Sequence, residues 1–255
     1  MHLVMYTFVL KFYVSYNINE FINILSGEII MYGATIKHPE DSLAFMRGLT
    51  FIGGFLNAYS FFTRGGAFVS FHTGNLVRIG LAVVLNDNFQ LWNSLTPVIG
   101  AFIGVVTATI IRNKITKDTL FNKAIVLTEI AVLFIIGFIG TNSIDYIINF
   151  TLSFIAMFQL SCFRKAKNVV HNTTIMTGNL RTLAQLFTNM FFERNKKNVM
   201  EFFTYLITFL SFIFGVIIGG FSSLRFEKMS IWICAAILLI LFIKMDKTDT
   251  QIKKF

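Results

Sequence analysis

Charge is what this chain has least of. Only 14% of its 255 residues are charged, 55% are hydrophobic, and the mean hydropathy is +0.68. Soluble domains carry about 25% charged residues, so this chain has too few polar side chains to cover a globule in water. The shortage argues against an ordinary soluble domain and predicts an integral membrane protein.

Cysteine is also scarce, and no catalytic motif is present. The two cysteines, Cys162 and Cys234, lie in apolar runs and form no CxxC pair or Cys/His cluster, so neither a disulfide framework nor a zinc site is supported. The chain has no Walker loop, no HExxH, no GxSxG and no carboxylates paired at helical spacing. We therefore expect no enzymatic activity, no cofactor and no bound metal.

The few charges that are present are mostly positive, with a net charge of +9. In a membrane protein such an excess is typical of cytoplasmic loops. No basic stretch alternates with an aromatic platform, so we expect no nucleic-acid partner. The expected partners are the lipid bilayer and a small polar solute, and nothing in the sequence supports a homo-oligomer.

Six stretches are apolar enough to cross a bilayer, which takes about 20 residues. They are 43–62, 92–111, 124–140, 146–163, 202–221 and 230–243. Two others, 67–85 and 173–190, are long enough but polar, and each contains an arginine. A central arginine costs about 2.5–3.5 kcal/mol on insertion scales. The predicted fold class is an all-α polytopic membrane protein with about six full transmembrane helices plus two polar re-entrant or broken helices.

Loop charges distinguish two ways of threading these stretches. If all eight cross, the basic loops at 112–123 and 194–197 lie on opposite sides of the membrane. If only the six apolar stretches cross, both basic loops and the lysine-rich C-terminal tail fall in the cytoplasm. The outside then keeps Arg64, Asp87 and the connection at 141–145. We therefore predict six crossings, with both termini cytoplasmic and each polar stretch returning to its own side.

The two polar stretches carry the same tetrapeptide, Thr-Gly-Asn-Leu, at 73–76 and 177–180. A shift of 104 residues superposes them and pairs the first apolar stretch with the fourth. Later, a shift of 115 pairs Gly100 and Gly104 with Gly215 and Gly219, each a small-residue contact face. We predict a two-fold repeat, inverted because each copy has three crossings. The alternative is that two membrane halves share amphipathic composition by chance.

This repeat divides the chain into four parts. Residues 1–40 are an N-terminal extension, 41–141 the first membrane repeat, 144–245 the second, and 246–255 a basic cytoplasmic tail. Residues 26–31 can be encoded with a ribosome-binding sequence just ahead of Met31, so we hypothesise that translation starts there. A short amphipathic interfacial segment is the alternative interpretation of the extension.

Two groups of residues resemble the signatures of a known family, the YoaK family of bacterial multi-pass membrane proteins. The first is Gly-Gly-Phe-Leu-Asn-Ala at 53–58 with Phe68, Thr73, Gly74 and Asn75. The second is Gln159 with Thr173, Thr174, Thr177, Gly178 and Asn179. The resemblance covers about residues 41–245. It implies a multi-pass protein of the bacterial inner membrane but no substrate, because the family is a domain of unknown function. The chain departs from the family at Asn57, usually an aspartate, and at Ser161, usually an asparagine.

The repeated tetrapeptides supply the candidate site. A helix that begins at Thr-Gly-Asn inside a protein-lined cavity presents backbone N–H groups that Thr or Asn can cap and that attract an anion or polar group. A following arginine strengthens the attraction for an anion, and a histidine can titrate near neutral pH. The candidate substrate-binding residues are His72, Thr73, Gly74, Asn75, Arg78, Gln159, Thr177, Gly178, Asn179 and Arg181.

Two functions fit this pattern. The first is a secondary transporter or channel for a small polar or anionic solute, with a site formed by two opposed half-helices. The second is a non-transporting membrane scaffold or sensor, in which the Thr-Gly-Asn motifs only let helices cross closely while Arg78 and Arg181 reach the interface. Glu129, the only carboxylate well inside an apolar stretch, is either a coupling-ion site or a side chain that reaches the cytoplasmic surface.

Overall fold

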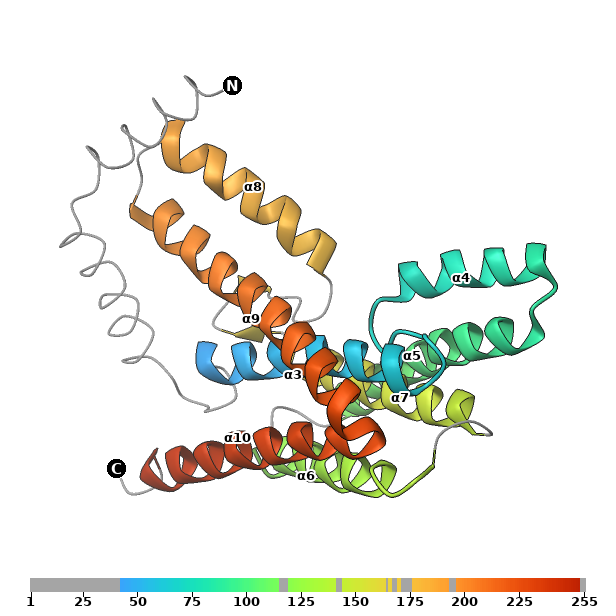
Figure 1. Cartoon of the computed structure of the whole chain (residues 1–255). Helices are drawn as coiled ribbons and strands as arrows, with labels where there is room; N and C mark the ends of the chain where they lie inside the picture. The colour runs from blue at the N-terminus through green and yellow to red at the C-terminus, as the bar shows by residue number, and fades with distance from the viewer. Residues whose placement is uncertain are drawn as a thin grey trace.

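The computed structural model describes residues 42–114, 119–140, 144–163, 165–166, 169–170, 176–192 and 196–252. Within these residues the chain forms eight α-helices (Figure 1). They are α3 (Leu43–Thr63), α4 (His72–Leu85), α5 (Asn88–Lys114), α6 (Thr119–Ile136), α7 (Asp145–Cys162), α8 (Met176–Phe192), α9 (Lys196–Phe226) and α10 (Ile231–Ile252). A 3-10 turn, η2 (Glu227–Ser230), joins the last two helices, and β1 (Lys165–Ala166) pairs with β2 (Val169–Val170).

The helical fold class is confirmed, and each predicted stretch overlaps one helix. Among the described residues, three helical segments are long and apolar enough to cross a membrane: Asn88–Lys114, Asp145–Cys162 and Asn198–Lys244, the last running through α9, η2 and α10. Helix α10 continues to Ile252, into the stretch predicted to be a basic tail. The predictions about residues 1–40 lie outside the described residues, as do those about Thr173 and Thr174.

Local signals set several helix ends. Ser42 caps α3, because its hydroxyl accepts a hydrogen bond from the backbone N–H of Phe45 at 3.2 Å. Helix α4 ends at Asn86, which adopts the left-handed conformation with φ of 54°. Asp87 then accepts a bond from the N–H of Gln90 at 2.9 Å and caps the next helix. Helices α4 and α5 therefore form a tight hairpin.

Glycines bring two pairs of helices into backbone contact. A Cβ added at Gly100 or Gly104 of α5 would collide with the α7 carbonyls of Phe150 or Phe154. In the same way, a Cβ at Gly215 of α9 would collide with the α3 carbonyl of Phe51, and a Cβ at Gly219 would lie 2.8 Å from the Phe55 carbonyl. Without side chains in the way, α5 packs on α7 and α9 packs on α3 along their lengths.

Contacts at both ends fix the relative direction of the remaining helices. Phe45 at the start of α3 contacts Phe163 just after α7, with ring centroids 5.4 Å apart. At the other end, Arg64 just after α3 pairs with Asp145 at the start of α7. Helices α3 and α7 therefore run antiparallel. Helices α6 and α10 do so too, because Trp232 at the start of α10 donates to the Phe134 carbonyl near the end of α6 at 3.0 Å.

Candidate functional site

The first polar stretch folds back along α3 before its helix begins. The chain turns at Gly65 and Gly66, which have φ of 74° and 82°. It then returns to Asn57, whose Oδ1 accepts from the Ser70 backbone N–H at 3.0 Å and whose Nδ2 donates to the Ser70 hydroxyl at 2.7 Å. Asn57 lies seven residues before Arg64, about 10 Å back along the helix. The non-helical segment between α3 and α4 thus folds back beside α3 before α4 begins.

Asn75, in the first Thr-Gly-Asn motif, holds this segment in place. Its side chain is fully buried and bonds Phe68 in both directions, accepting from the backbone N–H at 2.9 Å and donating to the carbonyl at 2.7 Å. Both hydrogen-bonding ends of the Asn75 amide are therefore engaged with the protein's own backbone. The geometry gives Asn75 a structural role.

The expectation that Thr or Asn caps the motif helix is wrong for α4. The N-cap is Phe71, and no side chain caps the helix, because Asn75 turns back to Phe68. Thr73 is exposed, and Gly74 is needed because a Cβ there would lie 2.5 Å from the ring of Phe71.

Two candidate residues of α4 have titratable or charged side chains: His72, its first residue, and Arg78, in its second turn. Both ring nitrogens of His72 are shielded from solvent and have no hydrogen-bond partner. Arg78 donates to the side-chain oxygen of Gln90 on α5 at 2.5 Å and lies over the ring of Phe61. Its guanidinium therefore braces the α4–α5 hairpin.

The second motif lies elsewhere in the fold. Thr177, Gly178 and Arg181 are exposed on α8, and a Cβ added at Gly178 would meet nothing within 4 Å, whereas Asn179 is 4% exposed. Helix α8 packs on α9, as α4 packs on α5. Figure 1 shows α4 and α8 on different sides of the molecule. The structure does not bring the two candidate groups together.

Gln159 is instead brought to a carboxylate. Its Nε2 donates to Oε2 of Glu129 on α6, and the two side chains are 7% and 1% exposed. The sequence left two alternatives for Glu129, a coupling-ion site or a side chain that reaches the cytoplasmic surface. Because its side chain is buried, the second alternative is wrong. Val126 and Leu133, one turn before and one turn after Glu129 on α6, belong to the apolar core.

A larger polar cluster lies where α3 ends and α7 begins. Arg64, expected in an outside loop, is fully buried, and its Nη1 lies 3.2 Å from Oδ1 of Asp145. The guanidinium also donates to the hydroxyl of Tyr59 and to the carbonyls of Ile136, Ile139 and Gly140. Every arm of this charge is thus occupied, which is what its burial requires.

Asn149 extends this cluster into the helix bundle. It donates to the Arg64 carbonyl at 2.8 Å and to Oδ1 of Asn93 on α5 at 2.9 Å, and it accepts from the hydroxyl of Ser60 on α3 at 2.5 Å. One turn further along α7, the hydroxyl of Ser153 donates to the Pro97 carbonyl of α5 at 2.6 Å.

We call the buried polar residues of this helix the α7 polar stripe: Asp145, Asn149 and Ser153 at four-residue spacing, and Gln159, which follows six residues later beyond the buried Ala156. All four are buried, and at 3.6 residues per turn they lie within one face of the helix. From Asp145 to Gln159 the stripe extends about 21 Å, most of the roughly 30 Å thickness of a bilayer core. Asp145, Asn149 and Ser153 are spaced four residues apart in the sequence. This spacing is the signal from which the first part of the stripe could have been predicted.

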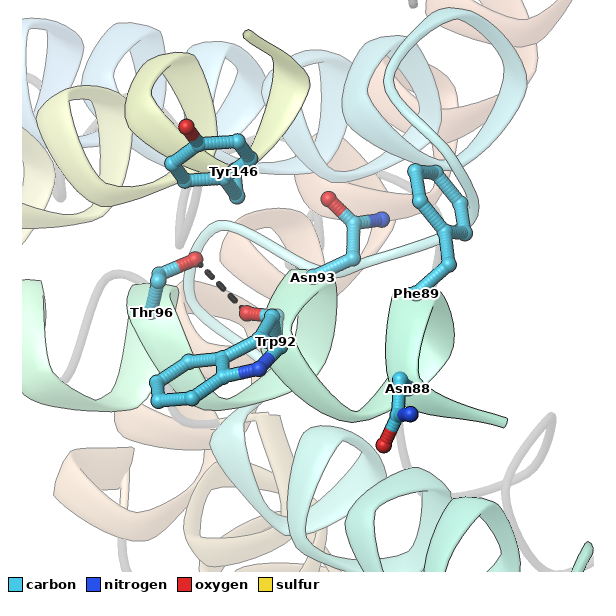
Figure 2. A pocket seen from close by; sticks show the side chains of 6 residues that line it. All are labelled: Asn88, Phe89, Trp92, Asn93, Thr96 and Tyr146. Atoms are coloured by element: carbon cyan, nitrogen blue, oxygen red, sulfur yellow. Dashed lines mark hydrogen bonds between the residues drawn. The ribbon is translucent and has the colours of Figure 1, made fainter. Parts of the chain in front are cut away.

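A pocket of about 590 Å³ lies beside the Asp145 end of this stripe. It is lined by Asn88, Phe89, Trp92, Asn93, Thr96 and Tyr146. Figure 2 shows the aromatic rings of Trp92, Phe89 and Tyr146 around the amide of Asn93. Aromatic side chains of this kind favour the membrane interface, while Asn93 connects the pocket to Arg64 and Asn149. The sequence analysis did not predict this pocket.

Among the residues that the structure describes, no group of three or more His, Cys, Asp or Glu side chains is arranged to hold a metal. The stripe holds two amides, one hydroxyl and one carboxyl, that of Asp145, which pairs with Arg64, while the carboxyl of Glu129 on α6 bonds Gln159. Such a set can bind and relay hydrogen-bonding solutes or protons. It contains no nucleophile activated by a neighbouring base.

Comparison with known proteins agrees with the family resemblance read from the two signatures. The family model described as protein of unknown function (DUF1275) matches residues 45–244, from α3 into α10. The UPF0700 transmembrane protein YoaK of Bacillus subtilis (strain 168) is 26% identical over 193 residues, which are 72% of this chain and 85% of that protein. No solved structure matches. The chain therefore belongs to the DUF1275 family of proteins of unknown function, and is a membrane protein similar to YoaK.

Proposed function

We propose that this protein is a secondary transporter or channel that moves a small polar or anionic solute along the α7 polar stripe. The stripe is the observation that carries the proposal. Polar residues inside a membrane-embedded bundle are costly, and they characteristically mark solute or ion pathways. Here the stripe begins at the Arg64–Asp145 pair at one end of α7, and its last member, Gln159, bonds Glu129 near the other end.

The direction of the helices supports six crossings and an inverted repeat. With six crossings, α3 and α7 cross in opposite directions, and so do α6 and α10. With eight crossings, both pairs would run parallel. The end-to-end contacts of Phe45 with Phe163 and of Trp232 with Phe134 favour the first arrangement. Inverted repeats of this kind are common among secondary transporters.

The glycine contacts support the repeat with a different offset from the one predicted. Gly100 lies on Phe150, and its repeat counterpart Gly215 lies on Phe51. The α7 and α3 partners are then 150 − 51 = 99 residues apart, instead of 104. The Thr-Gly-Asn motifs are still 104 residues apart, because the chain between helix and motif differs in length. The stretch from Cys162, the end of α7, to Thr177 is five residues longer than the stretch from Thr63, the end of α3, to Thr73.

In this proposal the segment before α4 shapes the outer entrance. The pocket at Trp92 and Asn93 admits the solute, and the Asn93 amide, which bonds the Arg64 carbonyl and Asn149, presents a hydrogen-bonding group that favours a polar one. The first-turn N–H groups of α4, beside the unpartnered ring of His72, add a second polar surface. The candidate residues of α8 are proposed to play the equivalent role on the opposite side.

Reconstituted protein tests the pathway. Proteoliposomes are challenged with formate, acetate, nitrate, phosphate, glycerol and urea, and flux is followed by solid-supported membrane currents or light scattering. We expect protein-dependent flux of at least one solute, reduced more than tenfold by Asn149→Leu or Asn149→Ser. Thr151→Val is the matched control, because the Thr151 hydroxyl only bonds its own helix at the Ile147 carbonyl. Flux that survives in both Asn149 variants would place the route elsewhere.

Cysteine labelling tests the threading. In a background with Cys162→Ser and Cys234→Ala, single cysteines replace Asp87, Glu227 or Arg194. Six crossings place residues 87 and 227 on the same side and residue 194 on the other. Eight crossings place residues 87 and 194 together, opposite 227. Labelling of residue 194 from outside would refute the inverted repeat.

The scaffold or sensor function has one observation in its favour, the complete engagement of Asn75 with the Phe68 backbone. The substitutions Asn75→Ala and Asn179→Ala separate the two functions. Intact folding with lost flux supports transport. If no solute in the panel moves and both substitutions only lower stability, the scaffold interpretation holds.

A further inference from the structure

We infer that Glu129, with Gln159 as its partner, is a proton-binding site in the middle of the helix bundle, and that this proton is the coupling ion. The second half of this statement rests on the proposed transport function. Glu129 lies ten residues from the start of α6 and seven from its end, so it is about 15 and 10 Å from the two helix ends. Its side chain is 1% exposed.

The surroundings of Glu129 cannot stabilise a permanent negative charge. Within the part of the chain that the structure describes, no cation forms an ion pair with Glu129. The groups that face it are the Gln159 amide on α7 and the Cys234 thiol on α10, and neither carries a positive charge. An ionised carboxylate buried with one neutral donor costs several kcal/mol. The enclosed conformation therefore favours the neutral acid.

Glutamine is suited to a partner that changes its protonation state. Its amide presents an NH₂ donor on one side and a carbonyl acceptor on the other, and rotation about a single bond exchanges them. Gln159 can donate to the carboxylate or accept from the carboxylic acid. A lysine or arginine at this position would instead hold Glu129 permanently ionised. The pair thus distinguishes Glu129 from Asp145, whose partner Arg64 fixes its charge.

The proton balance is simple. The carboxylate takes up one proton from water to become a carboxylic acid and returns it when the site next meets water. Because the ionised form requires solvent, deprotonation favours a conformation in which water reaches Glu129, and protonation favours the enclosed conformation seen here. A proton is thus taken up and released only as the bundle opens, which is the requirement for coupling.

Infrared spectroscopy of the full-length protein in lipid tests proton binding directly. At pH 7 exposed carboxyls are ionised, so we expect wild-type protein to show a carboxylic-acid C=O band that disappears on further raising the pH. Glu129→Gln, which preserves shape and neutrality, should lose this band. Glu227→Gln, in the exposed turn η2, should retain it. A band that persists in Glu129→Gln, or no band at pH 7 in folded wild-type protein, would overturn the assignment.

Gln159→Leu tests the partner. It removes the hydrogen bond to the carboxyl group, so the carboxylic-acid band should shift to higher frequency while remaining sensitive to Glu129→Gln. An unshifted band would show that Gln159 does not bond the proton site.

Proton movement in proteoliposomes separates this inference from the proposed function. Vesicles loaded with the pH-sensitive dye pyranine receive the same six solutes. We expect the internal pH of vesicles with wild-type protein to change when a transported solute is added. In vesicles with Glu129→Gln this pH change should be at least tenfold smaller. Solute-driven proton movement equal to wild type in Glu129→Gln refutes the coupling role and leaves transport standing. A titrating band with no solute moved in any assay leaves the proton site standing and refutes transport.

Discussion

Replacing Asp145 by asparagine removes the counter-charge of a fully buried arginine. Breaking a buried ion pair from one side costs about 3–5 kcal/mol, because the remaining charge loses its compensation. Arg64 keeps its bonds to Tyr59 and to the carbonyls at the end of α6, which solvate part of the charge. We therefore expect a loss near the lower limit, about 3 kcal/mol, or roughly a 10²-fold shift in the unfolding equilibrium.

Unfolding by sodium dodecyl sulfate in mixed micelles provides the measurement. The intrinsic fluorescence of Trp92 and Trp232 reports the transition, because both lie near the end of the bundle that contains the pair. Asp87→Asn is the matched control: Asp87 caps α5 from an exposed turn, and asparagine caps equally well, so a change below about 0.5 kcal/mol is expected.

A double substitution tests the reason for the loss. Arg64→Met combined with Asp145→Leu removes both charges, and apolar replacements of buried pairs are often neutral or stabilising. The double variant should therefore be more stable than Asp145→Asn alone. The reasoning fails if Asp145→Asn lies within 1 kcal/mol of wild type, or if the double variant is the least stable of the three.

Three further substitutions, one of them with a matched glycine control, test other contacts. Asn75→Ala leaves the partly buried backbone N–H and carbonyl of Phe68 unpaired. Each unsatisfied group costs about 1–3 kcal/mol, and partial burial favours the lower part of that range, so we expect a loss of about 2–4 kcal/mol in the same unfolding assay. Gly104→Ala forces α5 from α7 and should cost about 1–3 kcal/mol, whereas Gly80→Ala, in open space on α4, should stabilise by up to about 1 kcal/mol. Asn57→Asp removes both donors of a buried amide, and because only the neutral acid restores one of them, its stability should rise as pH is lowered.

The helices could be predicted because each depends on a local stretch of sequence. Runs of apolar residues set the six long helices, and polar runs beginning near the Thr-Gly-Asn motifs set α4 and α8. Cap identity was less predictable: the Asn75 side chain could bond the first-turn N–H groups or the Phe68 backbone, and only the path of the preceding loop decides between them.

The polar pairs could not be predicted, because their members are far apart in the chain. Arg64 and Asp145 are 81 residues apart, and charge counting correctly placed both at the same end of the bundle. It could not tell a solvated loop charge from a buried ion pair, since that depends on how α3 meets α7. Glu129 and Gln159 are 30 residues apart on different helices, and their meeting likewise depends on tertiary packing.

The two halves of the chain are interlocked through these contacts. Helix α3 packs mainly on α9 from the second half, and α7 packs mainly on α5 from the first. Arg64 and Asn93 also bond residues of the first half, but each of them, like Glu129, has one partner on α7. These partners are Asp145 for Arg64, Asn149 for Asn93 and Gln159 for Glu129. This one helix thus supplies a hydrogen-bond partner to polar groups on or next to three other helices, and these contacts exist only once the two halves have packed together.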